Sequence, residues 1–183
     1  MRKIAPVLAA ALVLVFGTTA YAGSVHLKGN TSPSFFDAVL QLIQTVSLSG
    51  LGNQDLLVSL TATADVTATC TNPAGATKPP GQNPAPITVT GSEAIPAGQI
   101  KNGNLTFSIE TQKPTTPIAG APDCPNSSWS EDITNLSFTT ANLTIQQPPG
   151  SAPIIVGGAT GCTVTFTPST SDGKVPASDV SCQ

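Results

Sequence analysis

Short runs in which apolar and polar residues alternate are separated by Pro- and Gly-rich segments along most of the sequence, and this pattern most constrains the fold. The alternation is clearest at 105–110, as expected of a half-buried strand. Proline and glycine concentrate at 71–86, 113–125 and 148–150, where they remove backbone donors and favour turns. Seven to nine strands with such connections predict an all-β fold, namely a single antiparallel β-sandwich, immunoglobulin-like or jelly-roll-like, with a partly open barrel as the alternative.

Three longer segments need more than simple alternation. Residues 34–48 fit both helical and strand spacing, and we interpret them as one long strand. The run 55–70 is long enough that we expect a bulge near 64–65. In 129–146 the apolar parity shifts twice, which predicts bulges or a corner because side chains of a strand alternate strictly between its faces.

The N-terminal segment has the three parts of a secretory signal peptide. Arg2 and Lys3 precede an apolar run over 4–16, and Ala20-Tyr21-Ala22 supplies small residues at a cleavage site. We therefore expect residues 1–22 to be removed and 23–183 to form the β-sandwich domain of a secreted, extracellular protein. The alternative is an uncleaved membrane anchor. No later stretch is long enough for membrane insertion after signal removal.

The charge of the mature chain excludes several classes of partner. Removal of residues 1–22 leaves 161 residues with five lysines, no arginine and ten carboxylates, a net charge of −5. Without a basic patch the chain has no means of neutralising phosphates, so neither nucleic acid nor an anionic membrane is an expected partner. Sparse charge on a Thr-rich chain favours an extracellular surface.

Four cysteines remain after signal removal, and an even number in an exported chain favours disulfides over a metal site. No C-x-x-C pair or neighbouring histidine supports zinc. The three pairings of Cys70, Cys124, Cys162 and Cys182 cannot be separated by sequence alone. The turn signal Asp172-Gly173 would place Cys162 nearly opposite Cys182, so we prefer Cys162–Cys182 and Cys70–Cys124.

Two stretches together resemble a family of small exported bacterial proteins. The first is Thr69-Cys70-Thr71-Asn72-Pro73 followed by Pro80-Gly81-Gln82-Asn83-Pro84, and the second is Cys124-Pro125-Asn126 followed by Trp129 and Ile133-Thr134. The resemblance covers roughly residues 48–146. It implies an exported β-rich protein and no particular activity, and it fits a Cys70–Cys124 bridge because both cysteine motifs belong to one recurring pattern.

No catalytic, cofactor-binding or metal-binding residue is predicted. His26 is the only histidine and lies close to the expected cleavage site, and no G-x-S-x-G elbow is present. Carboxylates could serve acid–base chemistry only as an unrecognised pair. Calcium ligands are less expected than ordinary Asx turns. The acidic candidates are Asp55, Asp65, Glu93, Glu110, Glu131 and Asp132, and the calcium candidates are Asn53, Asp55, Asp123, Asn126 and Asp132.

The stiff loop 72–86, with Pro80, Gln82 and Asn83, is a candidate binding loop, as is the segment around Trp129. For the tryptophan we favour a place in the core beneath a disulfide over an exposed binding role. The leading function is a non-catalytic extracellular or cell-envelope interaction or structural module that contacts a protein or a glycan. The alternative is a small secreted hydrolase, for which two desolvated carboxylates converging in one cleft would be the evidence.

Overall fold

In the computed structural model, the residues described are 25–30, 32–78, 84–156 and 163–182. Within these ranges the chain has twelve strands, three short 3-10 turns and no α-helix, which confirms the all-β prediction. The expected signal peptide lies outside the described residues. The elements are β1 His26–Leu27, η1 Lys28–Asn30, β2 Ser34–Asp37, β3 Leu42–Ser49, β4 Leu56–Thr71, β5 Thr77–Lys78, β6 Ile87–Ile95, η2 Ala97–Gln99, β7 Leu105–Glu110, β8 Ser130–Gln146, β9 Ile154–Val156, β10 Val164–Phe166, β11 Gly173–Lys174, η3 Ala177–Asp179 and β12 Val180–Cys182.

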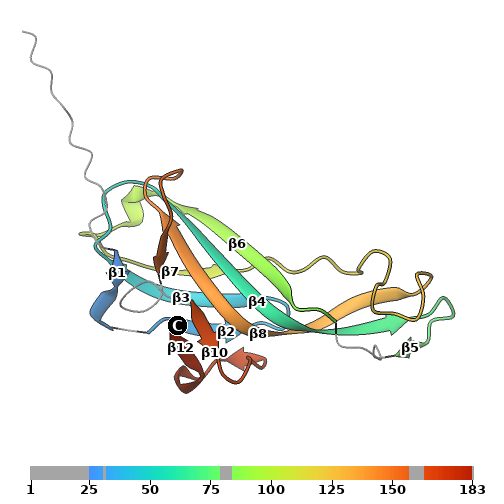
Figure 1. Ribbon diagram of the computed structural model, residues 1–183. Coiled ribbons are helices and arrows are strands. Elements are labelled where there is room, and N and C mark those ends of the chain that lie inside the picture. The colour runs from blue at the N-terminus through green and yellow to red at the C-terminus, as the bar shows by residue number, and fades with distance from the viewer. Residues whose placement is uncertain (1–24, 31, 79–83, 157–162, 183) are drawn as a thin grey trace, which may run out of the picture.

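The strands form two antiparallel sheets (Figure 1). In the first, β3 lies between β7 on one side and β1 and β2 on the other, and β11 pairs with β2. In the second, the long strands β4 and β8 are central; β5 and β6 pair with β4, β9 and β10 pair with β8, and β12 pairs with β10. Every strand pair of the two sheets is antiparallel within the described residues, as the hairpin-length connections predict.

The segment 34–48 is extended, as interpreted, but it is not one strand. It folds into a hairpin in which β2 pairs with the first half of β3, Ser34 lying opposite Thr45 and Asp37 opposite Leu42. The reversal occurs at Ala38–Gln41, where Val39 has φ 68° and its amide donates to Asp37 Oδ1 at 3.1 Å. The single-strand interpretation was wrong because residues 38–41 contain no Gly, Pro or Asn, the residues that usually indicate a turn in a sequence.

The two parity shifts in 129–146 correspond to two bulges in β8. Its register with β4 shifts between Thr63 and Ala64 and again between Thr67 and Ala68. The first shift lies next to the bulge expected near 64–65, but the extra residue belongs to β8 and not to the run 55–70. At each shift β8 has one extra residue, Thr139 and Thr134 respectively. Their hydroxyls donate to the carbonyl oxygens of Thr63 at 3.2 Å and Thr67 at 3.1 Å, so each bulge recovers a cross-strand hydrogen bond.

A single cluster of buried side chains unites the two sheets. The largest fully buried member is Phe138 of β8, joined by leucines and isoleucines from β3, β4, β6 and β8. Phe35 of β2 and Phe166 of β10 meet edge to face with ring centroids 5.0 Å apart. Because few aromatic residues are present, aliphatic side chains supply most of this core.

Backbone contacts connect the sheets along both edges. On one edge the Gln112 amide donates to the Thr90 carbonyl at 2.9 Å, which brings the end of β7 onto β6. On the other edge, the Thr170 amide donates to the Phe138 carbonyl at 2.9 Å. The Thr170 hydroxyl accepts from the Phe138 amide at 2.8 Å and donates to the buried carboxylate of Asp37.

Burial raises the pKa of Asp37. The hydrogen bonds from Thr170 and Val39 lower this pKa, and the negative charge of nearby Asp172 raises it further.

The arms before and after the predicted turn Asp172-Gly173 do pair, as β10 and β12. Their connection is not a tight hairpin, since Gly173 and Lys174 form β11 and pair with β2 in the other sheet. Cys182 lies opposite Val164. Cys162, and with it the predicted Cys162–Cys182 bridge, lies outside the described residues.

Candidate functional site

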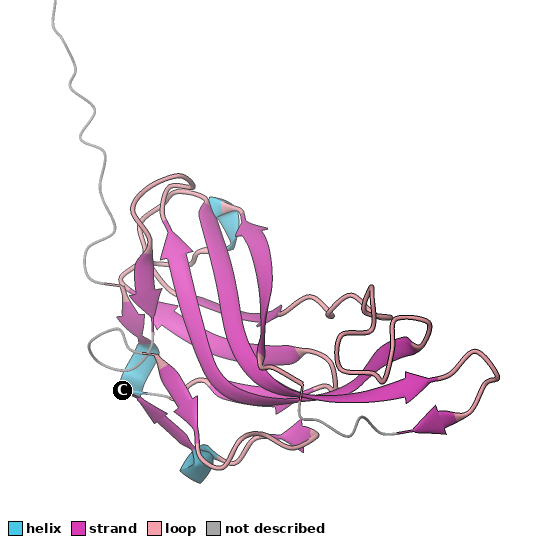
Figure 2. Cartoon of the chain, turned by 45° about the vertical axis from the view of Figure 1, so that its right-hand side comes forward, coloured by secondary structure: helices cyan, strands magenta, loops and turns pink. Residues whose placement is uncertain are grey.

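The distal halves of β4 and β8 form a two-stranded projection, which we call the arm. The pairing of β6 with β4 ends at Ala64, but β4 and β8 continue to pair from Asp65–Ser137 to Thr71–Ser130. At its far end the short strand β5 pairs with the end of β4. Both views show the arm extending beyond the rest of the molecule (Figures 1 and 2).

Residues 111–129 form a loop that folds back along the arm and covers the outer edge of β8. The Ile118 amide donates to the Glu131 carbonyl at 2.7 Å, and the Ile133 amide donates to Thr116 Oγ1 at 3.0 Å. Cys124 of this loop is bonded to Cys70 of β4, with Cα atoms 5.7 Å apart. This confirms the predicted Cys70–Cys124 bridge. The loop therefore satisfies donors that an exposed strand edge would leave open.

Glu131 lies beneath the folded-back loop and is fully buried. Its position on β8 is directly opposite Cys70. Its Oε2 accepts a hydrogen bond from the Asp123 amide at 3.2 Å, whereas Oε1 has no partner among the described residues. Burial raises the pKa of Glu131, the Asp123 amide opposes this, and the charge and side-chain hydrogen bond of the Asp123 carboxyl raise it further. The site thus places two carboxyl groups together beside the disulfide.

The Glu131→Gln variant should become progressively more stable than wild type as the pH rises. The raised pKa means that the folded state holds the proton of Glu131 more tightly than the unfolded chain. Its contribution to stability is therefore complete below the ordinary value of 4.5 and is lost as the pH rises through the folded pKa. Glutamine keeps an acceptor for the Asp123 amide and carries no charge. Denaturant unfolding at several values from about pH 4 to about pH 8 measures the difference.

The matched control for this experiment is Glu93→Gln, since Glu93 lies exposed on β6. Its difference from wild type over the same pH range gives the baseline for removing a carboxylate from the surface. A Glu131→Gln difference that does not rise above this baseline with pH, or that grows toward acid, would contradict the assignment of Glu131 as a proton-linked group.

The structure separates the other residues that the sequence singled out. Trp129 is half-buried just before β8 and is not part of the core cluster that unites the sheets, so the core position favoured for it was wrong. Pro80, Gln82 and Asn83 lie outside the described residues. Among the calcium candidates, Asn126 Oδ1 accepts from the Ser128 amide at 3.0 Å in an Asx turn. Within the described ranges, no three His, Cys, Asp or Glu side chains are grouped as metal ligands would be.

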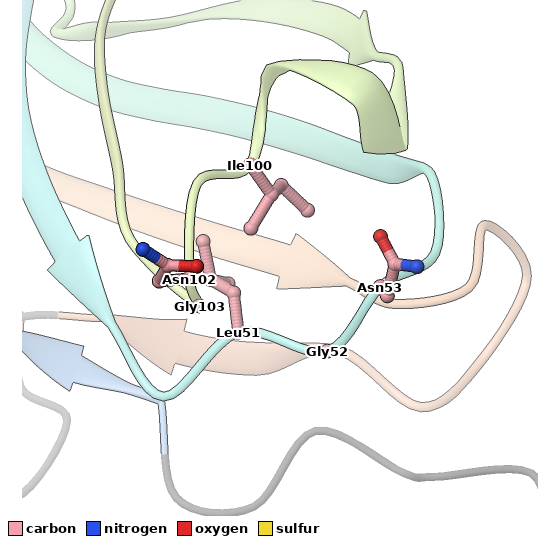
Figure 3. Close-up of a pocket in the computed structure, with 6 residues that line it drawn as sticks. All are labelled: Leu51, Gly52, Asn53, Ile100, Asn102 and Gly103. Carbon is pink, nitrogen blue, oxygen red and sulfur yellow. The ribbon is translucent and has the colours of Figure 1, made fainter.

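A second feature at the opposite end of β4 was not anticipated. The turn that precedes β4 meets the turn before β7 and encloses a hollow of about 370 Å³, lined by Leu51, Gly52, Asn53, Ile100, Asn102 and Gly103 (Figure 3). The buried carboxamide of Gln147 holds the first turn. Its Oε1 accepts from the Gly52 amide at 2.8 Å, and its Nε2 donates to the carbonyls of Gly52 at 3.0 Å and Gln54 at 2.8 Å. A glutamine next to Pro148 carries no sequence signal for such a role.

The sticks in Figure 3 show Asn53 and Asn102 on different sides of this hollow. Both side chains are exposed. The Leu51 amide donates to the Gly103 carbonyl at 3.1 Å, so the two turns are already joined by their own backbone. The hollow is therefore a junction between turns, and its geometry gathers no charged groups.

Comparisons with protein-family models, with curated proteins and with solved structures found no match for this chain. Across the described ranges, none of the helical segments has the length and apolar character that crossing a membrane requires.

Proposed function

We propose that this protein is a secreted, non-catalytic interaction module of the cell surface or its surroundings, built as a β-sandwich, and that the arm is its contact surface. The observation that carries the proposal is the construction of the arm. A disulfide and three loop-to-strand hydrogen bonds hold residues 111–129 against a two-stranded extension that contributes only Ile133 and Leu136 to the main core cluster. A projection stabilised in this way is preorganised, which reduces the ordering cost of binding.

The chemistry of the arm supports a protein or glycan as partner. Exposed or half-buried hydroxyl side chains line its solvent face, with Trp129 at the base of the covering loop. These hydroxyls belong to Thr67, Thr69, Thr71, Ser130 and Thr134. Hydroxyls donate and accept hydrogen bonds, and a tryptophan adds a large apolar face. Residues 23–183 contain no arginine that could bind phosphate groups, so we propose neither a nucleic acid nor a membrane as partner.

The carboxyl pair Glu131–Asp123 is the group that a hydrolase would have to use. Glu131 has no exposed surface, and a catalytic acid must come within hydrogen-bond reach of its substrate. Among the described residues, the Glu131 carboxyl lies under the covering loop and accepts a hydrogen bond from the Asp123 amide. The pair is therefore better explained as part of the attachment of the loop than as a catalytic dyad.

Binding of the labelled mature protein to intact producing cells, and to their isolated glycans and surface proteins, tests the proposal. We expect saturable retention that falls severalfold in Trp129→Ala and remains unchanged in the control Ser92→Ala, which alters an exposed residue of β6. Retention that Trp129→Ala and removal of the 111–129 loop both leave intact would refute the arm as contact surface. Turnover of any of these materials that is lost in Glu131→Gln would favour the hydrolase instead.

A further inference from the structure

A groove lies where the start of β2 meets β11, η3 and β12, away from the arm. Its volume is about 460 Å³, within the usual range of ligand sites. It is lined by Ser32, Pro33, Ser34, Lys174, Val175, Pro176, Ala177 and Val180. In Figure 1 this region lies beside the labels of β2 and β12.

Backbone hydrogen bonds hold both walls of the groove. The Val175 amide donates to the Phe35 carbonyl at 3.1 Å, which joins the two walls. The Asp179 amide donates to the Pro176 carbonyl at 3.1 Å, and the Thr167 amide donates to the Asp179 carbonyl at 2.8 Å, so η3 is tied at both ends. The groove is thus formed before any ligand arrives.

The lining is mostly aliphatic, with one positive charge. Val175 is buried and Val180 packs against the core, while Pro176 and Ala177 remain exposed. Beside the groove, Phe36 lies opposite Lys174 in the sheet and keeps 47% of its surface exposed, which makes it one of two large apolar side chains exposed in the described part of the chain. Apolar surface left open in this way is typical of a binding site.

The neighbouring acids are engaged elsewhere. Asp179 Oδ1 accepts from the Ser178 hydroxyl at 2.9 Å, Asp172 Oδ1 accepts from the Asn135 amide group at 2.8 Å, and Asp37 is buried in its bonds to Thr170 and Val39. The Lys174 ammonium forms no hydrogen bond or ion pair with any described side chain or carbonyl, and Lys174 is the only charged residue in the lining. Charge and apolar surface together therefore fit an anion with an aliphatic tail.

We propose that this groove binds a free medium-chain fatty acid, with its carboxylate at the Lys174 ammonium and its alkyl chain along Pro33, Val175 and Val180. The aliphatic lining supplies affinity through burial of methylene groups, at about 0.8 kcal/mol each when fully buried. The ion pair supplies preference for a carboxylate over a neutral head group. This binding site is separate from the arm, so an experiment can support or refute fatty-acid binding without testing the proposed function of the arm.

Decanoate and its neutral counterpart decanol are the probes, each titrated below its aggregation threshold into the mature protein. Binding is followed by calorimetry, and its location by backbone amide NMR shifts. We expect saturable binding of decanoate, with shifts at Lys174–Val180, and weaker binding of decanol. Lys174→Gln should weaken decanoate two- to fivefold, the effect of about 0.5–1 kcal/mol for an exposed ion pair, and leave decanol unchanged.

A second variant tests the aliphatic wall. Ala177→Glu places a carboxylate at an exposed position of η3, so the fold should tolerate it while decanoate affinity falls at least tenfold. The control Lys113→Gln removes an exposed lysine from the loop on the arm and should change nothing. Absence of saturable binding, shifts located elsewhere, or equal losses for decanoate and decanol in Lys174→Gln would each overturn the proposal.

Discussion

Gly91→Ala is expected to lower the free energy of unfolding by about 3 kcal/mol or more, a large fraction of the stability of a typical domain. Gly91 lies in β6 where the end of β7 crosses it. A β-carbon at this position would be 1.8 Å from the Glu110 carbonyl oxygen and 3.0 Å from the Thr111 Cα. These are backbone atoms, and they cannot turn aside as a flexible side chain could. Relief would require separating β6 from β7 and breaking the Gln112–Thr90 hydrogen bond.

Gly98→Ala is the matched control for this substitution. Gly98 lies in η2, and a β-carbon there meets no atom within 4 Å. We expect it to be neutral or to stabilise the protein by up to about 0.5 kcal/mol, because alanine restricts the unfolded chain. Urea unfolding followed by circular dichroism measures both variants. A Gly91→Ala protein as stable as the Gly98→Ala protein would show that the sheets do not approach each other this closely.

Simultaneous replacement of Cys70 and Cys124 by alanine is expected to cost about 4 kcal/mol. The bridge joins residues 54 apart in the sequence, and the loss of loop-closure entropy in the unfolded chain grows with that separation. The covering loop should loosen first. The hydrogen bonds of Ile118 with Glu131, of Ile133 with Thr116 and of Asp123 with Glu131 would then hold the loop over buried Glu131 without the bridge.

Hydrogen exchange separates this local effect from global destabilisation. In the double variant the amides of Ile118 and Ile133 should exchange much faster. Amides in the pairing of β4 with β6, such as Val89, should exchange faster only to the extent that the loss of global stability dictates. The single variants Cys70→Ala and Cys124→Ala should match the double variant, because either one removes the bridge. Unchanged exchange at Ile118 in the double variant would mean that the disulfide does not hold the loop.

The sequence was most informative where a pattern is local. Ile133, Leu136, Phe138, Leu143 and Ile145 can occupy one face only if β8 contains two extra residues, and two bulges are present. The Cys70–Cys124 pairing was also predicted, as the pair left when the turn at Asp172-Gly173 favoured Cys162–Cys182, and the structure contains it. The turn at Ala38–Gln41 was missed because its conformation depends on Asp37 and on contacts with β8, where the Leu136 amide donates to the Val39 carbonyl.

Strand periodicity, sparse charge and the cysteine count follow from composition and from the two-residue repeat of an extended chain. The sequence alone therefore determined the all-β class and the bulges of β8, and it favoured one of the three disulfide pairings without deciding it. The burial of Glu131, the need for glycine at position 91, the role of Gln147 and the groove at Lys174 were decided only by the tertiary structure. Each depends on residues from distant parts of the chain that come together when the two sheets pack against each other. The order of residues along the chain does not encode the distances between them in the folded protein.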